Sequence, residues 1–160
     1  MAETHAHEGE RGHEHMAVAE ASAGGVAGRV GLTVLGAAGL IIGAFLDWLS
    51  GTVDFGGLSG TELGARIFIS DADVDPSFLA SAGAIVILLG LLALLGLAFR
   101  SGWLTRMAGA LGVIAFVLFT ISLFRAGGGL GGIGIGMWVV LVGGVVALVG
   151  GFVGTRRVIT

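Results

Sequence analysis

Four histidines near the amino terminus are the side chains of this sequence best suited to bind a metal ion. They stand in two close pairs with glutamates around them, at His5, His7, His13 and His15. Neutral imidazole and carboxylate groups are good ligands for Zn²⁺, Ni²⁺ and Cu²⁺, and a histidine-rich tail is typical of some metal transporters. The alternative is a solvated tail. Because residues 1–28 are hydrophilic and lack hydrophobic periodicity, we expect them to be disordered and cytoplasmic.

A group of acidic side chains, Asp71, Asp73 and Asp75, alternates along the chain like the first ligands of a calcium-binding loop. Such a loop needs glycine at its sixth position and an acid at its twelfth, where this sequence has Pro76 and Ala82. The preferred interpretation is that Asp75 caps a helix and that Pro76 is its first residue, because proline is favoured there. A cation site is the alternative.

No arrangement of residues in the sequence indicates catalysis. The chain contains no cysteine, and it lacks the patterns of a nucleophile with its base, of a zinc protease and of a phosphate-binding loop. The segment 129–134 has the glycine spacing of a dinucleotide-binding loop, but that loop requires a preceding strand within a βαβ unit. We therefore predict no enzymatic activity, no cofactor and no nucleic-acid partner.

The elements that carry these residues are four apolar segments. Of the 160 residues 55% are hydrophobic and only 12% are charged, and the mean hydropathy is +1.00, which is outside the range of soluble domains. A helix needs roughly 20 apolar residues to cross the hydrocarbon core of a bilayer. We predict an all-α membrane protein, a four-helix transmembrane bundle within residues 29–157, with spans at about 30–47, 78–99, 103–124 and 137–154 and a short tail at 158–160.

Few polar groups lie deep within these spans. Pumps and ion-coupled transporters usually place acids, histidines or paired charges near the middle of the membrane. The deep polar residues here are hydroxyl side chains, which we expect to donate to backbone carbonyl groups of their own helices: Thr33, Ser81, Thr120 and Ser122.

The loop 48–77, between the first two spans, is the one extramembrane connection long enough to fold. The segment 66–70 has β-propensity and several glycines precede it, so we predict a small β-hairpin on the outer end of the bundle. Because the loop is acidic, an outer-face sensor is one of the functions that it would suit.

The distribution of arginine predicts the orientation, since cytoplasmic segments retain Lys and Arg. With the amino terminus inside, the inner face carries Arg11, Arg29, Arg100, Arg106, Arg156 and Arg157, and the outer face carries Arg66 and Arg125. Both termini are therefore expected in the cytoplasm. Trp48, Trp103 and Trp138 stand at span boundaries, where we expect them to anchor the helices in the membrane interface.

Glycine is abundant in the spans, with 32 glycines in the chain. Small residues allow helices to approach closely in lipid, and we expect packing contacts at Gly36, Gly39, Gly43, Gly83, Gly90, Gly109, Gly112, Gly150 and Gly154. The main interpretation is packing within the bundle. The alternative is oligomerisation through the two GxxxG patterns, 39–43 and 150–154.

The order of parts is similar to the claudin-type tetraspan plan: four short spans, a longer first outer loop that contains Trp48 and the pair 57–58, and a short second loop. The chain also resembles the small uncharacterised four-span membrane proteins of actinobacteria, in its turn 100–106 and in the entry 134–138 to the last span. The claudin loop cysteines are missing, so the junction-forming function is not implied. The absence of Lys, Asn, Gln and Tyr suits a GC-rich genome, and we predict the plasma membrane of a bacterium.

These observations favour a non-catalytic tetraspan protein, an accessory, scaffold or assembly subunit that packs against itself or a larger membrane complex through glycine-rich helix faces. One alternative is a small transporter or metal-handling protein that gathers a divalent cation on its histidine-rich tail. The other alternative is the outer-face sensor.

Overall fold

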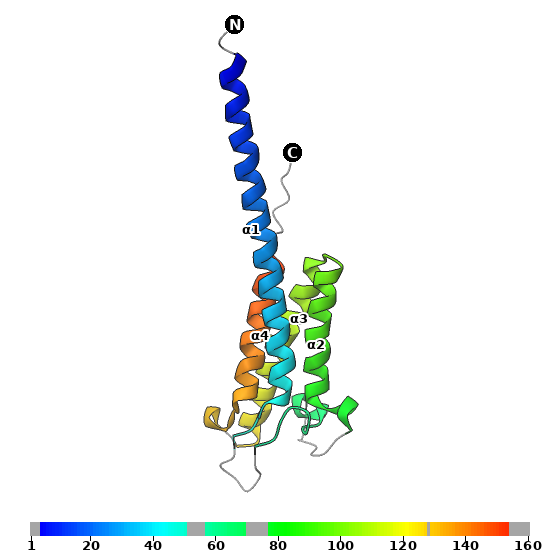
Figure 1. The fold of residues 1–160 in the computed structure, drawn as a ribbon. Coiled ribbons are helices and arrows are strands. Elements are labelled where there is room, and N and C mark those ends of the chain that lie inside the picture. The colour runs from blue at the N-terminus through cyan, green and yellow to red at the C-terminus, as the bar shows by residue number, and fades with distance from the viewer. Residues whose placement is uncertain (1–3, 51–56, 70–76, 128, 154–160) are drawn as a thin grey trace.

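The computed structural model describes the backbone of residues 4–50, 57–69, 77–127 and 129–153, and the side chains within these ranges from residue 25 onward. Within them the chain forms four α-helices, α1 (Thr4–Phe45), α2 (Ala82–Ala98), α3 (Gly102–Arg125) and α4 (Ile135–Phe152), and three short 3-10 helices, η1 (Ala65–Phe68), η2 (Phe78–Ala80) and η3 (Leu130–Gly132). The tight turn between α2 and α3 lies at one end of the bundle, the turn end. The longer connections gather at the other, the loop end (Figure 1).

Three of the helical segments are long and apolar enough to cross a membrane: Gly25–Phe45 of α1, the whole of α3 and the whole of α4. The fourth, α2, is a shorter apolar helix of 17 residues. Its length is about 25 Å, and η2 adds about 6 Å just before it, against a hydrocarbon core of about 30 Å. The chain is a multi-pass membrane protein.

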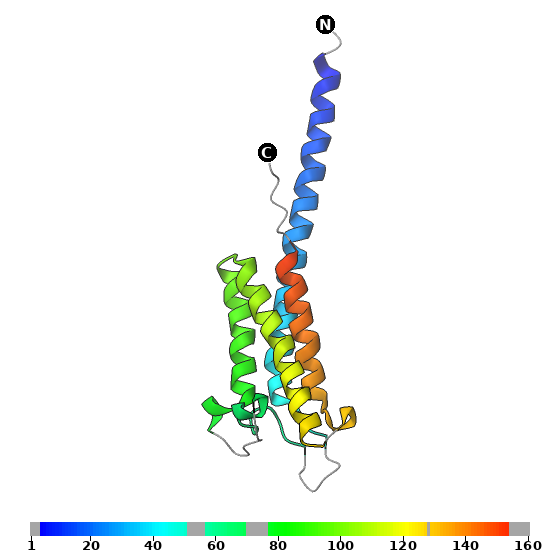
Figure 2. The same cartoon turned by 180° about the vertical axis from the view of Figure 1, so that it is seen from behind.

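The first helix begins well before the span predicted at 30–47. The backbone of residues 4–28 is helical, in contrast to the disordered tail that we expected. Alanine and glutamate, which favour helix, are frequent in this segment, and it contains no proline. Figure 2 shows this part of α1 projecting beyond the turn end, away from the other helices.

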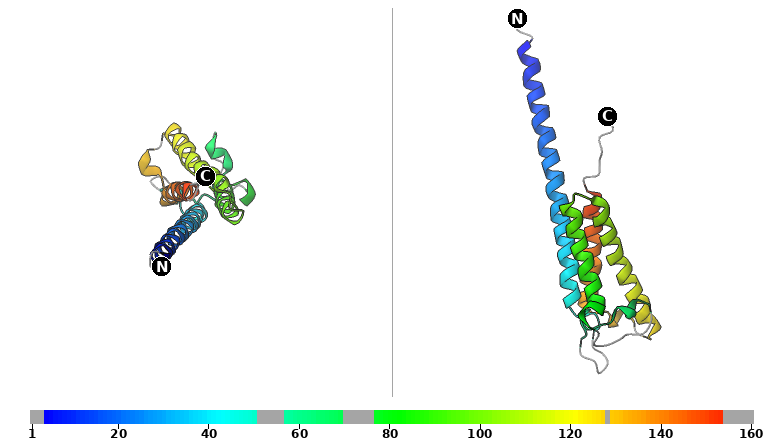
Figure 3. Two further views of the ribbon diagram at one scale, coloured as in Figure 1. Left: turned by 90° about the horizontal axis from the view of Figure 1, so that it is seen from above. Right: turned by 90° about the vertical axis from the view of Figure 1, so that its right-hand side faces the viewer.

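Each helix packs against its neighbours in chain order, and α4 closes the ring by packing against α1. The α1–α4 and α3–α4 pairs are the most extensive, whereas α1 and α3 lie diagonally opposite and barely touch. The view along the bundle in Figure 3 shows this arrangement. Helix α4 therefore takes part in both of the most extensive helix pairs, with α1 and with α3.

The bundle turns small residues inward and large apolar residues outward. On α2 the buried positions include Gly83, Gly90, Ala93 and Gly96. The exposed positions of the same helix include Leu88, Leu91, Leu95 and Phe99 at its end. A soluble bundle has the opposite arrangement, and exposed apolar surface on every helix is what a lipid environment accommodates.

The predicted β-hairpin in the loop 48–77 is not found, since no strand occurs in the part of the chain that the structure describes. Residues 65–68 form η1 instead. Isolated bridges join Asp47 to Ser59 and Gly64 to Ser81. The loop pairs with the ends of α1 and α2 rather than with itself, because the backbone groups that follow and precede those helices need partners at the loop end.

The start of α2 also differs from the sequence prediction, which placed the cap at Asp75 and the first helical residue at Pro76. The observed cap is Ser81, whose hydroxyl accepts a hydrogen bond of 3.1 Å from the backbone N–H of Ala84. The residues just before it form η2. Serine satisfies a free N–H of the first turn as well as aspartate does, and Asp75 and Pro76 lie outside the described residues.

Candidate functional site

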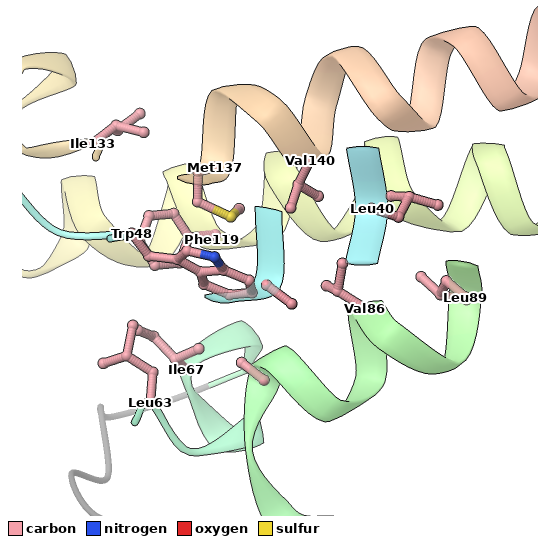
Figure 4. Packing of buried hydrophobic residues seen from close by; sticks show 12 residues of the cluster. Leu40, Trp48, Leu63, Ile67, Val86, Leu89, Phe119, Ile133, Met137 and Val140 are labelled. Atoms are coloured by element: carbon pink, nitrogen blue, oxygen red, sulfur yellow. The ribbon is translucent and has the colours of Figure 1, made fainter. Parts of the chain in front are cut away.

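The loop end of the bundle is closed by Trp48, the third residue after the end of α1. Its side chain is 0% exposed, and its Nε1 donates a 2.9 Å hydrogen bond to the carbonyl oxygen of Gly43. The indole meets the ring of Phe119 edge to face at 5.5 Å and that of Phe68 at 6.2 Å. Figure 4 shows it among side chains from α2, α3, α4 and η1. Trp48 thus joins the loop to three helices.

Backbone hydrogen bonds fix the segment 46–48, the strap, to two other parts of the chain. Its N–H donates to the carbonyl oxygen of Leu58 at 2.8 Å, and its own carbonyl oxygen accepts from Gly134 at 2.6 Å. The N–H of Gly136 donates to Asp47 at 2.8 Å. Because Gly134 and Gly136 have no side chain, the start of α4 can lie directly against this strap: a Cβ atom at Gly136 would be 2.6 Å from the carbonyl oxygen of Leu46.

The three tryptophans therefore differ in their surroundings. Trp103 is 67% exposed and Trp138 is 42% exposed, and Trp138 packs on Phe116 with ring centroids 5.3 Å apart. Both keep apolar surface available for a membrane interface. The interfacial position that we predicted for Trp48 does not fit its complete burial, and the reason is the loop, which folds back over it.

The glycines singled out in the sequence lie mostly between helices. Those whose neighbours belong to another span are Gly36, Gly39, Gly43, Gly90, Gly109, Gly112 and Gly150. Gly83 faces the loop instead, at Gly60 and Thr61. Gly154 is outside the described residues. The closest approach among them is at Gly36, where a Cβ atom would overlap the backbone nitrogen of Ala147 and lie 2.7 Å from its Cα.

The central glycines of α4, Gly143 and Gly144, were missed by the sequence analysis. A Cβ atom on Gly143 would lie 2.9 Å from the carbonyl oxygen of Gly36, and one on Gly144 would lie 3.1 Å from that of Gly109. Adjacent residues thus contact α1 and α3. The heptad spacing of Gly136, Gly143 and Gly150 was the signal that could have found the α1 contact, because residues seven apart share a helix face.

The deep hydroxyl groups divide into bonded and unbonded ones. Thr120 Oγ1 donates to the carbonyl oxygen of Phe116 at 2.8 Å, and Ser81 Oγ donates to that of Phe78 at 2.7 Å. Thr33 and Thr105 are both 0% exposed, and their Oγ1 atoms have no hydrogen-bond partner. The expected bonding to backbone carbonyls is therefore wrong for Thr33. Its hydroxyl lies against Gly150, 3.0 Å from where a Cβ atom would be.

At the turn end two arginines lie near the end of α4. Arg106 Nε donates to the carbonyl oxygen of Gly151 at 2.8 Å, and its guanidinium lies 4.2 Å from the ring centre of Phe152. A cation suits the carboxyl end of a helix. Arg29, on α1 one turn before Thr33, has buried Nε and Nη2 atoms without a hydrogen-bond partner.

Two apolar grooves run along opposite sides of the bundle. The first, the α1/α4 groove, has a volume of about 460 Å³ and is lined by Leu35, Ala38, Gly39, Ile42, Ile135, Trp138, Val139, Val142, Gly143 and Val146. The second, the α2/α3 groove, has a volume of about 440 Å³ and is lined by Ala65, Arg66, Phe68, Ile69, Ile85, Leu89, Leu111, Ile114, Ala115 and Leu118. Volumes of this size are in the range of ligand sites.

The predicted metal ligands cannot be placed. The side chains of His5, His7, His13 and His15 lie outside the described residues, as do Asp71, Asp73 and Asp75. Among the residues that the structure does describe, no three His, Asp or Glu side chains gather where they could hold a metal ion. Metal binding and the acidic-loop sensor therefore stay predictions.

The glycine-rich segment before α4 forms a short helical connection. Residues 130–132 are η3, and Ile133, which follows η3, is buried in the core at the loop end.

Comparison with known proteins adds no assignment: the chain matches no protein-family model, no curated protein and no solved structure. The likeness to claudins and to actinobacterial four-span proteins stays a sequence-based expectation.

Proposed function

We propose that this protein is a non-catalytic subunit of a membrane assembly, which crosses the bilayer four times and docks a transmembrane helix of another polypeptide in the α1/α4 groove. The observation that carries the proposal is the floor of that groove, which consists of the small residues Ala38, Gly39 and Gly143. Transmembrane helices associate where small residues let a partner's side chains come close to the backbone.

The walls of the groove support the same function. Leu35 and Ile42 stand along α1, and Val142 along α4, all three substantially exposed. No charged residue lines the groove, so a helix would enter it without burying an unpaired charge. The glycines themselves contact neighbouring helices within the bundle. Gly39 and Gly143 contact each other between α1 and α4, so a partner would lie over that contact, on the outer side of the groove floor.

Single cysteines test this surface, because the chain has none of its own. Val142→Cys places a thiol in the groove, and Leu88→Cys places one on α2 at a similar exposure, 64% against 60%. Oxidative crosslinking in membranes of the source organism should join Val142→Cys to one defined species, another protein or a second copy. The Leu88→Cys control should give no such product.

Filling the groove separates docking from chance collision. Adding Ala38→Leu to Val142→Cys should abolish the crosslink while the protein still reaches the membrane in normal amount. Equal crosslinking at both cysteines, or a Val142→Cys product that survives Ala38→Leu, would contradict the proposed docking surface.

We further propose that the termini lie in the cytoplasm of a bacterium. Three arginines stand at or near the turn end, Arg29, Arg100 and Arg106, and two at the loop end, Arg66 and Arg125. This distribution favours a cytoplasmic turn end. On intact cells a membrane-impermeant thiol reagent should label Ala126→Cys, at the loop end, and should label Ser101→Cys, at the turn end, only after permeabilisation. The reverse pattern would invert the topology.

A further inference from the structure

The α2/α3 groove has a cationic residue at one end and is otherwise apolar. Ile85 and Leu89 line it from α2, and Leu111, Ile114 and Leu118 line it from α3. Arg66 of η1 is the one charged residue among those that line it. The groove therefore offers a long hydrophobic surface with a positive charge next to it. These properties are complementary to an amphiphile with an anionic head group.

The way α2 and α3 meet explains why this groove exists. At the turn end they are close, because a Cβ atom at Gly96 would lie 2.8 Å from the backbone nitrogen of Thr105. At the loop end η1 packs against both helices, and its Ile67 is buried there. The seam between α2 and α3 is thus closed by glycine at one end and filled by η1 at the other, with the groove along its outer side.

The side chain of Arg66 lies at the surface of the loop end. Arg66 is exposed and makes no ion pair with any residue that the structure describes. A guanidinium group presents a planar fork of N–H donors that matches two oxygens of a phosphate group. Its place at the loop end puts it near the depth of lipid headgroups if α2 and α3 span the hydrocarbon core.

Exposed apolar residues beside η1 support that depth. Ile69 is 81% exposed, and Phe78 and Leu79 of η2 are 52% and 88% exposed. Large apolar side chains that protrude from short helices next to a membrane span are suited to the boundary between headgroups and acyl chains. The exposed side chains of the loop end thus suit the interface, and Arg66 lies at the same end of the bundle.

We infer that the α2/α3 groove binds a phospholipid, with one acyl chain along α2 and α3 and the phosphate group at Arg66. Two alanines, Ala65 and Ala115, line this groove but no glycine does, so it lacks the glycine floor of the α1/α4 groove. An acyl chain adapts to the branched side chains that make up most of its lining. The inference rests on insertion in a membrane and is independent of docking at the α1/α4 groove on the opposite side.

Native mass spectrometry of the full-length protein tests the site. After delipidation in mild detergent, the protein is titrated with phosphatidylglycerol, with diacylglycerol of the same acyl chains, and with inorganic phosphate. Phosphatidylglycerol should bind at one saturable site, and diacylglycerol and phosphate alone should each bind at least about tenfold more weakly, because each lacks one half of the ligand.

Matched variants assign the two halves of the site. Arg66→Gln should weaken phosphatidylglycerol binding about tenfold and leave diacylglycerol binding unchanged, and Arg66→Lys should restore part of it. Ile114→Trp, which fills the groove at a half-exposed position, should weaken binding of both lipids. Arg125→Gln removes a charge at the same end outside the groove and should change neither.

The outcomes decide between a site and general lipid adhesion. Equal binding of phosphatidylglycerol by the wild type, Arg66→Gln and Arg125→Gln would overturn the inference. So would an Ile114→Cys variant that crosslinks to a second polypeptide, since the groove would then hold a partner helix. Thermal unfolding of each variant in the same detergent, unchanged from the wild type, shows that the bundle is intact.

Discussion

The seam between α1 and α4 and the seam between α2 and α3 lie on opposite sides of the same bundle and are built differently. Along α1 and α4, Gly36, Gly39 and Gly143 bring the backbones together over the length of the contact. Along α2 and α3 the close approach is confined to Gly96 near the turn, and η1 takes over at the loop end. The helices of this protein pack most closely where glycines lie between them. The two grooves therefore differ although their volumes are nearly equal: glycines line the α1/α4 groove, and none lines the α2/α3 groove.

The largest effect should come from a side chain added where the first seam is tightest. Gly36→Leu cannot be accommodated, because the Cα of Ala147 would lie 2.7 Å from its Cβ. We expect a loss of about 3 kcal/mol or more in the free energy of unfolding, measured by thermal or denaturant unfolding in detergent. Gly28→Leu is the matched control, since nothing lies within 4 Å of its Cβ, and it should change little. Similar losses for both would mean that the seam is not tight.

A smaller effect should follow from Trp48→Phe, which acts on the loop end rather than on either seam. The variant removes the hydrogen bond to Gly43 and part of the buried ring. We expect a loss of about 1–3 kcal/mol, accompanied by faster proteolysis in residues 57–69, which the ring holds down. Faster cleavage without loss of bundle stability would show that residues 57–69, which cover the loop end as a cap, unfold separately from the bundle. Unchanged cleavage would refute its role as a cap.

The unbonded hydroxyl in the α1/α4 seam should be nearly dispensable. Thr33→Val keeps the shape of the side chain and removes a buried hydroxyl without a partner, so we expect the free energy of unfolding to rise by up to about 1 kcal/mol. Thr120→Val on α3 removes a hydroxyl that is bonded to Phe116 and should lower it by a similar amount. A clear loss of stability in Thr33→Val would contradict this, because it would mean that the Thr33 hydroxyl forms a stabilising hydrogen bond.

The smallest effect concerns pH at the turn that precedes η1. Glu62 accepts hydrogen bonds from the backbone N–H and the hydroxyl of Ser59, both at 2.8 Å, and these bonds lower the pKa of its carboxyl group. Because the folded pKa is below the unfolded value, the stabilisation is present above the unfolded pKa and is lost as pH falls through the folded one. Hydrogen exchange of residues 59–64 should accelerate over that acidic range.

Glu62→Gln provides the control for this pH dependence. The amide keeps the shape of the side chain but does not titrate, so exchange in the same residues should no longer change over the acidic range beyond its intrinsic chemistry. A pH dependence that persists in Glu62→Gln would assign it to another group of the loop.

The sequence predicted the helices well because hydrophobicity and length determine a membrane span directly. Spans expected at 103–124 and 137–154 correspond to α3 and α4 within two residues at each end. The start of α2 was misplaced, since Asp75–Pro76 and Ser81 are both good starting signals and the pairing of Gly64 with Ser81, a contact between distant residues, is not visible in local sequence.

The same distinction between local and distant contacts applies to the candidate sites. Small-residue positions such as Gly39 were recognisable, because their composition alone permits close approach. Their partners were not, and neither was the burial of Trp48, which depends on Leu58 and Gly134 arriving from two other parts of the chain. The grooves depend on the spacing between whole helices, for which a single sequence has no direct signal.

Helix α4 is the last of the four helices to be synthesised, and it is also the one that α1 packs against most extensively. Until residues 135–152 enter the membrane, α1 has only α2 as a close neighbour, and the small-residue face around Gly36 and Gly39 is open to lipid. Assembly of the bundle is therefore completed only when α4 has entered the membrane. A protein truncated before α4 would expose to the membrane's quality-control proteases the small-residue face that α4 covers in the complete bundle.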